Sequence, residues 1–370
     1  MKQLILIVLI GLILLVIGCT AENQDTNSND IKFQPKTDVN YAELSMNPKD
    51  VNFAYVLRGE HWKLTSQFYG GLNDYLQSQP RSITLLKGEE ITDVNFVEKF
   101  IDELNQKIYL KSLVDYIKQI EVSDADKVRI VVSLVQNIPY DYNAYYRIEN
   151  DENNIEKYPY QVLYLNTGVC GEKSRLLIYF LRELGYGTAY INFEKENHAV
   201  TGIKCPIKYS YKDSGYCFIE STAPTIITYS EGEYLNAGKL SSTPKIIVSS
   251  EGMSFDSVSE EFNDALRYKE LIKDHLGNNY SDWLSLMSKY GLEKSSCFDG
   301  SVLCNGECWT ACLPQQIFNC DAKTGATCKW DAKNCPTGMT ACNNECYPNC
   351  TEGTFECAQQ GVVCHIVKYR

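Results

Sequence analysis

The stretch TGVCGEKSRLLIYFLRELGYGTAYI, residues 167–191, decides how the fold of this chain is interpreted. A flexible Gly-Val step leads to a run, residues 172–184, whose apolar side chains recur at helical spacing on one face. Gly185 is a typical helix end, and residues 188–193 then favour a strand. The stretch therefore predicts a buried helix, with Cys170 in its first turn, that leads directly into a sheet.

The residues that follow predict a small antiparallel sheet. Strand-like pieces span residues 188–193, 199–203 and 217–220, and residues 245–248 are a candidate fourth strand. A buried helix followed by antiparallel strands is an α+β arrangement. We therefore predict an α+β fold in which the helix of Cys170 packs on an antiparallel sheet.

Outside this core the patterning predicts helices. Residues 31–120 alternate apolar and polar groups in a mostly helical way, so we expect a helical N-terminal part. Ser123 can cap a further helix, which Pro139 ends. Residues 140–164 hold seven of the 26 tyrosines and predict a loop, which is either packed through hydrogen bonds or forms the wall of a cleft. Residues 255–292 predict two more helices.

The N-terminus has the features of a secretory signal over residues 1–18. Lys2 precedes an apolar run that ends in VIGC, and Cys19 closes it. This ending is similar to the lipobox of prokaryotic lipoproteins, in which Cys19 would carry the lipid. The alternative is an uncleaved anchor, although about fifteen apolar residues fall short of the ~20 that span a bilayer. Either interpretation places the chain outside the cytoplasm, with polar residues 19–40 as a flexible tether.

The net charge and the cysteine content indicate which partners and which compartment the protein can have. The 370 residues carry 35 basic and 47 acidic side chains, a net charge of −12, which argues against a sequence-independent nucleic-acid partner. Twelve of the 16 cysteines fall between Cys297 and Cys364. Such a density is typical of disulfides formed in an oxidising compartment.

The cysteine-rich tail is a duplication. Two six-cysteine units, residues 295–332 and 333–370, repeat with a period of 38 residues, and LCNGECWTAC matches ACNNECYPNC. Each unit is too small for a sizeable core, so we expect three disulfides in each, with pairings that the sequence does not fix. The units either bind an envelope polymer or protein, with Trp309, Tyr347 and Phe355 as contacts, or form a protease-resistant appendage.

Counting the cysteines isolates one thiol. Once the tail and Cys19 are set aside, three remain, and Cys205 and Cys217 flank a turn-rich stretch that could close a loop. We predict that these two pair and that Cys170 stays free, which in an oxidising compartment suggests a reactive thiol. At the start of a helix, the positive end stabilises a thiolate and backbone N–H groups can face an oxyanion.

A base and an orienting carboxylate follow in order. His198 stands at the head of one predicted strand and Glu220 on the next, and neighbouring antiparallel strands bring side chains to about 5 Å. Glu220 can then fix the tautomer of the imidazole. We predict a triad of Cys170, His198 and Glu220, and no metal site, because the tail lacks the usual spacing of zinc ligands. Three histidines lie in contexts that suggest no catalytic role: His61, His275 and His365.

Four segments carry a resemblance to a known family. DADKVRIVVSLVQNIPYDYN, the Cys170 stretch, NHAVTGI and YCFIESTAP resemble the transglutaminase-like superfamily, cysteine enzymes of papain-like plan, over about residues 120–225. The resemblance implies a papain/transglutaminase-like core. Two positions depart from the family pattern: Glu220 stands where the family usually has Asp, and Ala199 and Val200 stand where an aromatic often follows the histidine.

The resemblance also implies a reaction, which is acyl transfer through a thioester. Cys170 would attack an amide carbonyl, and His198 would give a proton to the departing amine. Water or a second amine would then resolve the acyl-enzyme, so that the protein is either a peptidase or amidase, or a transglutaminase. The residues do not choose between these outcomes.

These inferences combine into one expected organisation. Residues 41–250 form the catalytic domain and residues 251–294 a helical connector to the tail. The substrate is a peptide or protein, no cofactor is needed, and the protein is a monomer held at the cell membrane. The alternative is a catalytically silent envelope-binding or adhesion scaffold. The presence of Cys170, His198 and Glu220 favours the enzyme.

Overall fold

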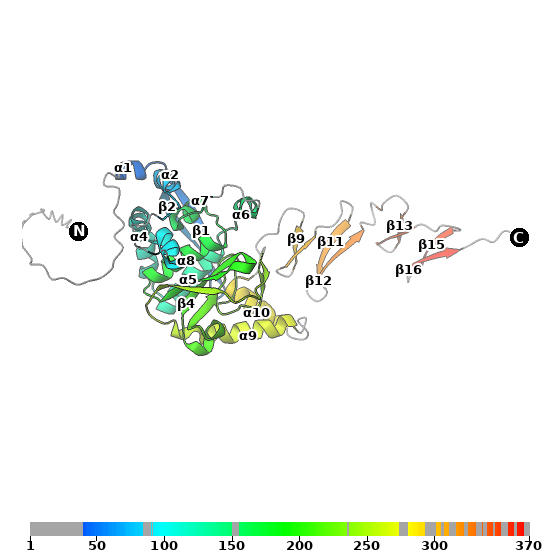
Figure 1. Ribbon diagram of the computed structural model, residues 1–370. Helices are drawn as coiled ribbons and strands as arrows, with labels where there is room; N and C mark the ends of the chain where they lie inside the picture. The colour runs from blue at the N-terminus through cyan, green and yellow to red at the C-terminus, as the bar shows by residue number, and fades with distance from the viewer. Residues whose placement is uncertain are drawn as a thin grey trace, which may run out of the picture. The chain divides into compact units, whose positions relative to one another are not determined.

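A computed structural model describes most of the chain between residues 40 and 292, and strands of the tail (Figure 1). The described ranges are 40–83, 90, 92–149, 155–234, 237–273, 280–292 and 335, with the eight tail strands given below. The predicted signal, the Cys19 lipidation site and nearly all of the predicted tether lie outside these residues. Among the helices in this part of the chain, none is both long enough and apolar enough to cross a membrane.

Helix α8, Cys170–Glu183, is the buried helix that the sequence predicts. Leu177 and Leu181 are fully buried. Its inner face is fastened to strand β4, His198–Lys204, by two side-chain hydrogen bonds. The Ser174 hydroxyl donates to the Ala199 carbonyl at 3.0 Å, and the Thr201 hydroxyl donates to the Ser174 carbonyl at 3.1 Å. These bonds fix the position of α8 along β4, and with it the position of Cys170 relative to His198.

The sheet behind α8 has four antiparallel strands in the order β5-β4-β3-β8. Besides β4, its members are β3 Thr188–Phe193, β5 Tyr216–Ile219 and β8 Lys245–Ser250. All four lie where the sequence predicts strands. Because successive side chains alternate between faces, Val200 points away from α8 and joins a second buried cluster with Phe193, Phe218 and Tyr234. Tyr234 belongs to a short hairpin of β6, Glu233–Tyr234, and β7, Gly238–Lys239.

The N-terminal part is not wholly helical, so that expectation is wrong. Strands β1, Pro48–Leu57, and β2, Glu60–Tyr69, form an antiparallel hairpin. Arg58 and Gly59 make the two-residue turn, with positive φ angles of 52° and 85°. Helices take up most of the remainder: α1 Tyr41–Leu44, α2 Gly70–Ser78, α3 Asp93–Ile101 and α4 Leu104–Gln119.

Helix α5, Asp124–Gln136, begins and ends as the sequence predicts. The Ser123 hydroxyl accepts from the backbone N–H of Asp126 at 3.1 Å and so caps the helix. The tyrosine-rich stretch that follows is not a single loop, which corrects the prediction. It contains α6, Tyr142–Glu149, and α7, Pro159–Leu165.

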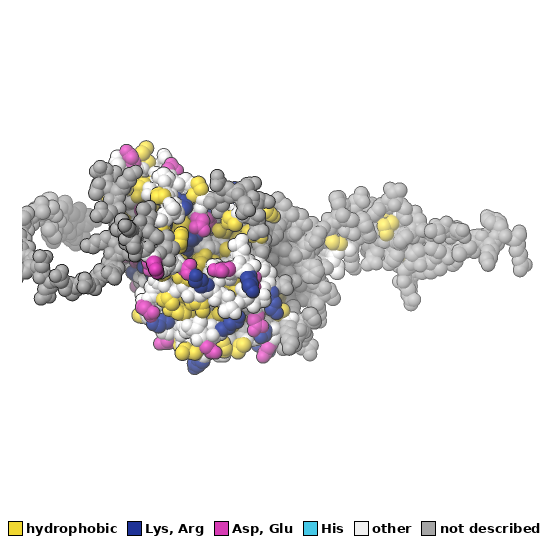
Figure 2. Space-filling view, in the orientation of Figure 1, with side chains coloured by type: hydrophobic (Ala, Val, Ile, Leu, Met, Phe, Trp, Pro, Cys, Tyr) yellow, Lys and Arg dark blue, Asp and Glu magenta, His cyan; other side chains and the backbone are white. Residues whose placement is uncertain are grey.

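Helices α9, Ser259–Lys273, and α10, Tyr280–Tyr290, appear in yellow in Figure 1. They bury Leu271, Trp283 and Met287 against each other. They also contact the rest of the body, since the Lys289 carbonyl accepts from Gly59 at 3.0 Å and Arg129 of α5 pairs with Glu261. The predicted connector is thus packed on the β1–β2 turn and on α5. On the face shown in Figure 2, acidic and basic side chains are interspersed.

Where the structure describes the tail, its strands form β-hairpins, two in each six-cysteine unit. The first unit contains β9 Ser301–Cys304, β10 Glu307–Thr310, β11 Gln316–Asp321 and β12 Gly325–Trp330. The second contains β13 Met339–Cys342, β14 Glu345–Pro348, β15 Thr354–Ala358 and β16 Gly361–His365. A disulfide joins Cys342 to Cys357 within the second unit. The duplication seen in the sequence therefore has a counterpart in the strand pattern.

Candidate active site

Cys170 is the first residue of α8, and its thiol is free and partly accessible. The turn before it is held by Glu172, a fully buried carboxylate. Glu172 accepts from the backbone N–H of Val169 at 3.0 Å and of Lys157 at 2.8 Å. The ammonium of Lys157 bridges Glu172 and Asp141, at 3.1 and 2.8 Å. The backbone that presents the thiol is therefore pinned from inside the protein.

His198 and Glu220 form a buried pair beside this thiol. His198 Nε2 and Glu220 Oε2 are 2.8 Å apart, and the two residues are 3% and 0% exposed. The other carboxylate oxygen, Glu220 Oε1, accepts from the backbone N–H of Ser221 and from both the N–H and the hydroxyl of Thr222, at 2.7–2.9 Å. Burial alone would raise the pKa of Glu220, but its bonds to His198 and Thr222 lower that pKa below its usual value. Glu220 is therefore a carboxylate with a fixed orientation.

The protonation of His198 follows from the same neighbours. Burial by itself would lower the pKa of the imidazole, yet hydrogen bonds to Cys170 and Glu220 raise that pKa to about 10. Because Nε2 pairs with Glu220, Nδ1 is the ring nitrogen that is left to accept a proton from, or donate one to, Cys170. The Cys170 Sγ also lies 3.9 Å from the Asn197 carbonyl. The structure thus pairs His198 with Glu220 and places the Cys170 thiol against the backbone of Asn197, the residue before His198.

Lys173 lies on the interior side of this group, and no sequence pattern singled it out. Its fully buried Nζ donates to the carbonyls of Ile138, Thr222 and Gln136, at 2.5, 3.0 and 3.3 Å. Three acceptors match the three N–H groups of an ammonium ion. Burial lowers the pKa of Lys173 to about 7, against the favourable charge of Glu220. Lys173 thereby ties the helix of Cys170 to the segment that follows Glu220.

Two further contacts around His198 were also missed. The ring of Tyr234 stacks on the imidazole, with centroids 5.9 Å apart and planes at 12°. Glu196, just before His198, accepts from the backbone N–H groups of Ser241 and Ser242 at 3.0 and 2.8 Å. Both contacts bring the segment around β6 and β7 to the histidine. Both contacts join residues that are far apart in the sequence, so no local sequence pattern predicts them.

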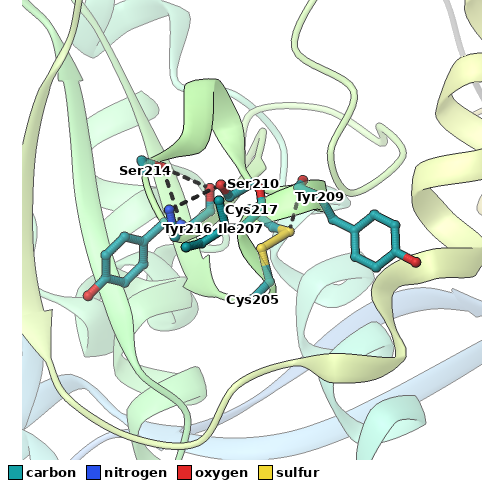
Figure 3. Close-up of a disulfide and its surroundings, with 8 residues drawn as sticks. Cys205, Ile207, Tyr209, Ser210, Ser214, Tyr216 and Cys217 are labelled. Atoms are coloured by element: carbon teal, nitrogen blue, oxygen red, sulfur yellow. Dashed lines mark hydrogen bonds between the residues drawn. A yellow bond between two sulfur atoms is a disulfide. The ribbon is translucent and has the colours of Figure 1, made fainter.

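Cys205 and Cys217 form a disulfide with a Cα–Cα distance of 5.8 Å, the pairing expected from the sequence (Figure 3). Figure 3 shows this bond beside the turn that contains Ser210 and Ser214. Cys205 directly follows β4 and Cys217 lies in β5, so the bridge joins the two strands that lead to His198 and Glu220. It lies at the opposite end of β4 from His198.

The remaining candidate residues contribute nothing to this group. His61 lies in β2, where it is exposed and paired with Val56. His275 lies outside the described residues, as do the side chains of His365, Trp309, Tyr347 and Phe355. Within the part of the chain that the structure describes, no group of three or more His, Cys, Asp or Glu side chains is arranged to hold a metal ion.

Comparison with known proteins adds little. No family model matches the chain, and a search of curated proteins finds no match. Among solved structures, a crystal structure of a TGase aligns with a TM-score of 0.25 and 18% sequence identity. The alignment covers 46% of this chain and 43% of that one. A superposition of this quality does not establish a shared fold.

Proposed function

We propose that the protein is a cysteine acyl-transfer enzyme of the transglutaminase-like kind, acting on amides of peptides or proteins. We further propose that it works outside the cytoplasm, held at the membrane through its N-terminus. One observation carries the enzymatic proposal: a free thiol at the start of a buried helix lies beside the segment of His198, whose imidazole a buried carboxylate orients. A nucleophile, a base and an orienting group in this relation can perform acyl transfer.

At the start of the reaction His198 is the imidazolium that its raised pKa predicts, and Cys170 reacts as the thiolate paired with it. The thiolate attacks the amide carbonyl, forming a C–S bond and an oxyanion that backbone N–H groups at the start of α8 can stabilise. The C–N bond then breaks as the imidazolium protonates the leaving nitrogen. Ammonia or an amine departs, and a thioester remains on Cys170.

The second half restores the enzyme. His198, now neutral, takes a proton from water or from an incoming amine, which attacks the thioester carbonyl. The C–S bond breaks, the Cys170 thiolate leaves, and the product is a carboxylic acid or a new amide. Throughout both halves Glu220 remains ionised and holds the imidazole. The 2.8 Å contact between His198 and Glu220 supports a glutamate in this role.

The proposal is tested by comparing the activity of a variant at His198 with that of a control variant at His61. Wild type, Cys170→Ala, His198→Ala and His61→Ala are assayed for ammonia release from a glutamine-containing peptide, with and without a fluorescent primary amine. We expect activity in wild type and His61→Ala, and losses of at least about 10³-fold in the other two, because each acts in the bond-making step. Incorporation of the amine separates transfer from hydrolysis.

Two results would contradict the proposal. The first is full activity in Cys170→Ala. The second is a folded wild-type protein whose Cys170 resists iodoacetamide at neutral pH and which releases no ammonia from peptides. That second result would favour the silent scaffold.

A further inference from the structure

Tyr190 is a third polar group beside the nucleophile, and the proposed reaction has not yet used it. It lies in β3 and, like its cross-strand partner Thr201, points toward α8. A Cβ atom added to Gly171 would lie only 2.9 Å from the Tyr190 hydroxyl. The phenol oxygen therefore approaches the backbone of the residue next to Cys170, at a position where only glycine leaves room for it.

The hydroxyl of Tyr190 is available for a new hydrogen bond. Among the contacts of the described residues, none uses it as donor or acceptor, although the side chain is half-buried. Half-buried hydroxyls normally have partners. The charge of Arg175 acts on Tyr190, and its Nη2 would lie 3.8 Å from the same added Cβ. Arg175 is itself occupied, since it pairs with Glu156 at 3.2 Å and lies 4.1 Å over the ring of Phe100.

The surroundings keep this phenol neutral. Burial raises the pKa of Tyr190 above its usual value, which the positive charge of Arg175 opposes and the nearby Cys170 reinforces. A phenol that stays protonated is a hydrogen-bond donor over the whole working range of a cysteine enzyme. Arg175 also polarises the O–H bond, because its positive charge favours electron density on the phenol oxygen.

We propose that Tyr190 is a catalytic residue that donates a hydrogen bond to the substrate carbonyl oxygen as that oxygen becomes negative during attack by Cys170. This inference rests on the proposed function. The backbone N–H groups at the start of α8 supply the other donors. The oxyanion forms with the C–S bond and collapses when the C–N bond breaks, and Tyr190 keeps its proton throughout.

The test compares two reactions of the same thiol. Alkylation of Cys170 by iodoacetamide develops no oxyanion, whereas acylation by p-nitrophenyl acetate does. Tyr190→Phe should leave the alkylation rate within about twofold of wild type and slow acylation by roughly 10–10³-fold, the range for loss of one oxyanion donor. Tyr186→Phe is the matched control, because Tyr186 precedes β3 and its ring packs on Phe255, and it should change neither rate.

Each result decides the inference. Unchanged acylation in Tyr190→Phe would overturn it, and so would equal losses in both reactions, which would show that Tyr190 positions the thiol instead. If wild type is folded and unacylated, the proposed function itself has failed. If Tyr190→Phe does not fold, Gly171→Ala replaces it, because the added methyl group displaces the Tyr190 hydroxyl but keeps the ring. Slower acylation of Gly171→Ala with unchanged alkylation supports the inference. Any other pattern of the two rates overturns it.

Discussion

At the scale of single residues, Lys173 joins the site to the interior. Its three hydrogen bonds run to carbonyls of two separate segments, one of which follows Glu220. Replacing it with methionine would leave three buried carbonyls without donors. We expect Lys173→Met to lower the free energy of unfolding by about 1–3 kcal/mol or more, measured by urea denaturation. Lys195→Met, at an exposed lysine near His198, is the control and should change little. A loss no larger than the control's would contradict this role.

The protonation of His198 predicts a pH dependence of stability. Its pKa of about 10 in the folded protein lies above the ordinary 6.5, so the folded state keeps a proton that the unfolded state releases. The stabilisation is fully present below about pH 6.5 and is lost as the pH rises through 10. We expect the melting temperature of wild type to fall more between pH 6.5 and 10 than that of His198→Gln. Parallel curves for the two proteins would disprove the raised pKa.

Some residues of the site can be predicted from the local sequence, and others can be recognised only in the folded structure. Cys170, His198 and Glu220 can be predicted because a free thiol at a helix start and two polar residues at strand ends are unusual in sequence. Lys173 and Tyr190 sit within an ordinary amphipathic helix and an ordinary strand. Their significance comes from neighbours that only the folded chain brings close, so the sequence alone did not select them.

At the scale of elements, the disulfide between β4 and β5 fastens the strands that lead to His198 and Glu220. It closes a loop with a sequence separation of 12, and such bridges typically contribute about 2–4 kcal/mol. We expect the double variant Cys205→Ser, Cys217→Ser to melt at a lower temperature but to keep Cys170 reactivity, because the bridge lies at the far end of β4.

The measurement is a thermal unfolding curve together with iodoacetamide labelling well below the melting temperature. Wild type treated with a mild reductant provides the matched comparison. Loss of Cys170 reactivity in a double variant that remains folded would mean that the bridge sets the geometry of the site as well as its stability.

Elements differed in how far the sequence predicted them. Helices α5 and α8 and the four strands of the sheet were placed well, because caps, stops and continuous apolar patterns agree there. The hairpin of β1 and β2 was missed, although Val51, Phe53 and Tyr55 are buried at every second position and Arg58-Gly59 forms its turn. Because Val56 is buried as well, the period of two is interrupted, and the pattern of these residues is less regular than that of an ideal half-buried strand.

At the scale of the whole molecule, the tail and the body have different sources of stability. The body has a core of buried apolar side chains, whereas the hairpins of the tail include cysteines that are disulfide-bonded. We expect a chain that ends after Leu292 to unfold within a few degrees of the full-length body and to retain Cys170 labelling. Reduction should unfold the tail first in the full-length protein.

Calorimetry of the full-length and truncated chains, with and without reductant, checks this expectation. A truncated chain that no longer folds would make the tail a structural part of the proposed enzyme. Disulfide mapping by mass spectrometry supplies an independent check, since bridges between the two six-cysteine units would contradict the prediction that each folds alone.

The bond between Cys205 and Cys217 would also hold β4 and β5 in the alignment that joins His198 to Glu220. In the paired strands Ile203 faces Cys217 and Thr201 faces Ile219, so the same alignment, continued, sets Thr222 opposite His198. A slip of one residue between β4 and β5 would turn the Glu220 side chain to the other face of the sheet and leave His198 without its carboxylate. Oxidation of the correctly aligned strands makes such a slip impossible thereafter. Once it has formed, the disulfide would therefore keep Glu220 as the residue that pairs with His198.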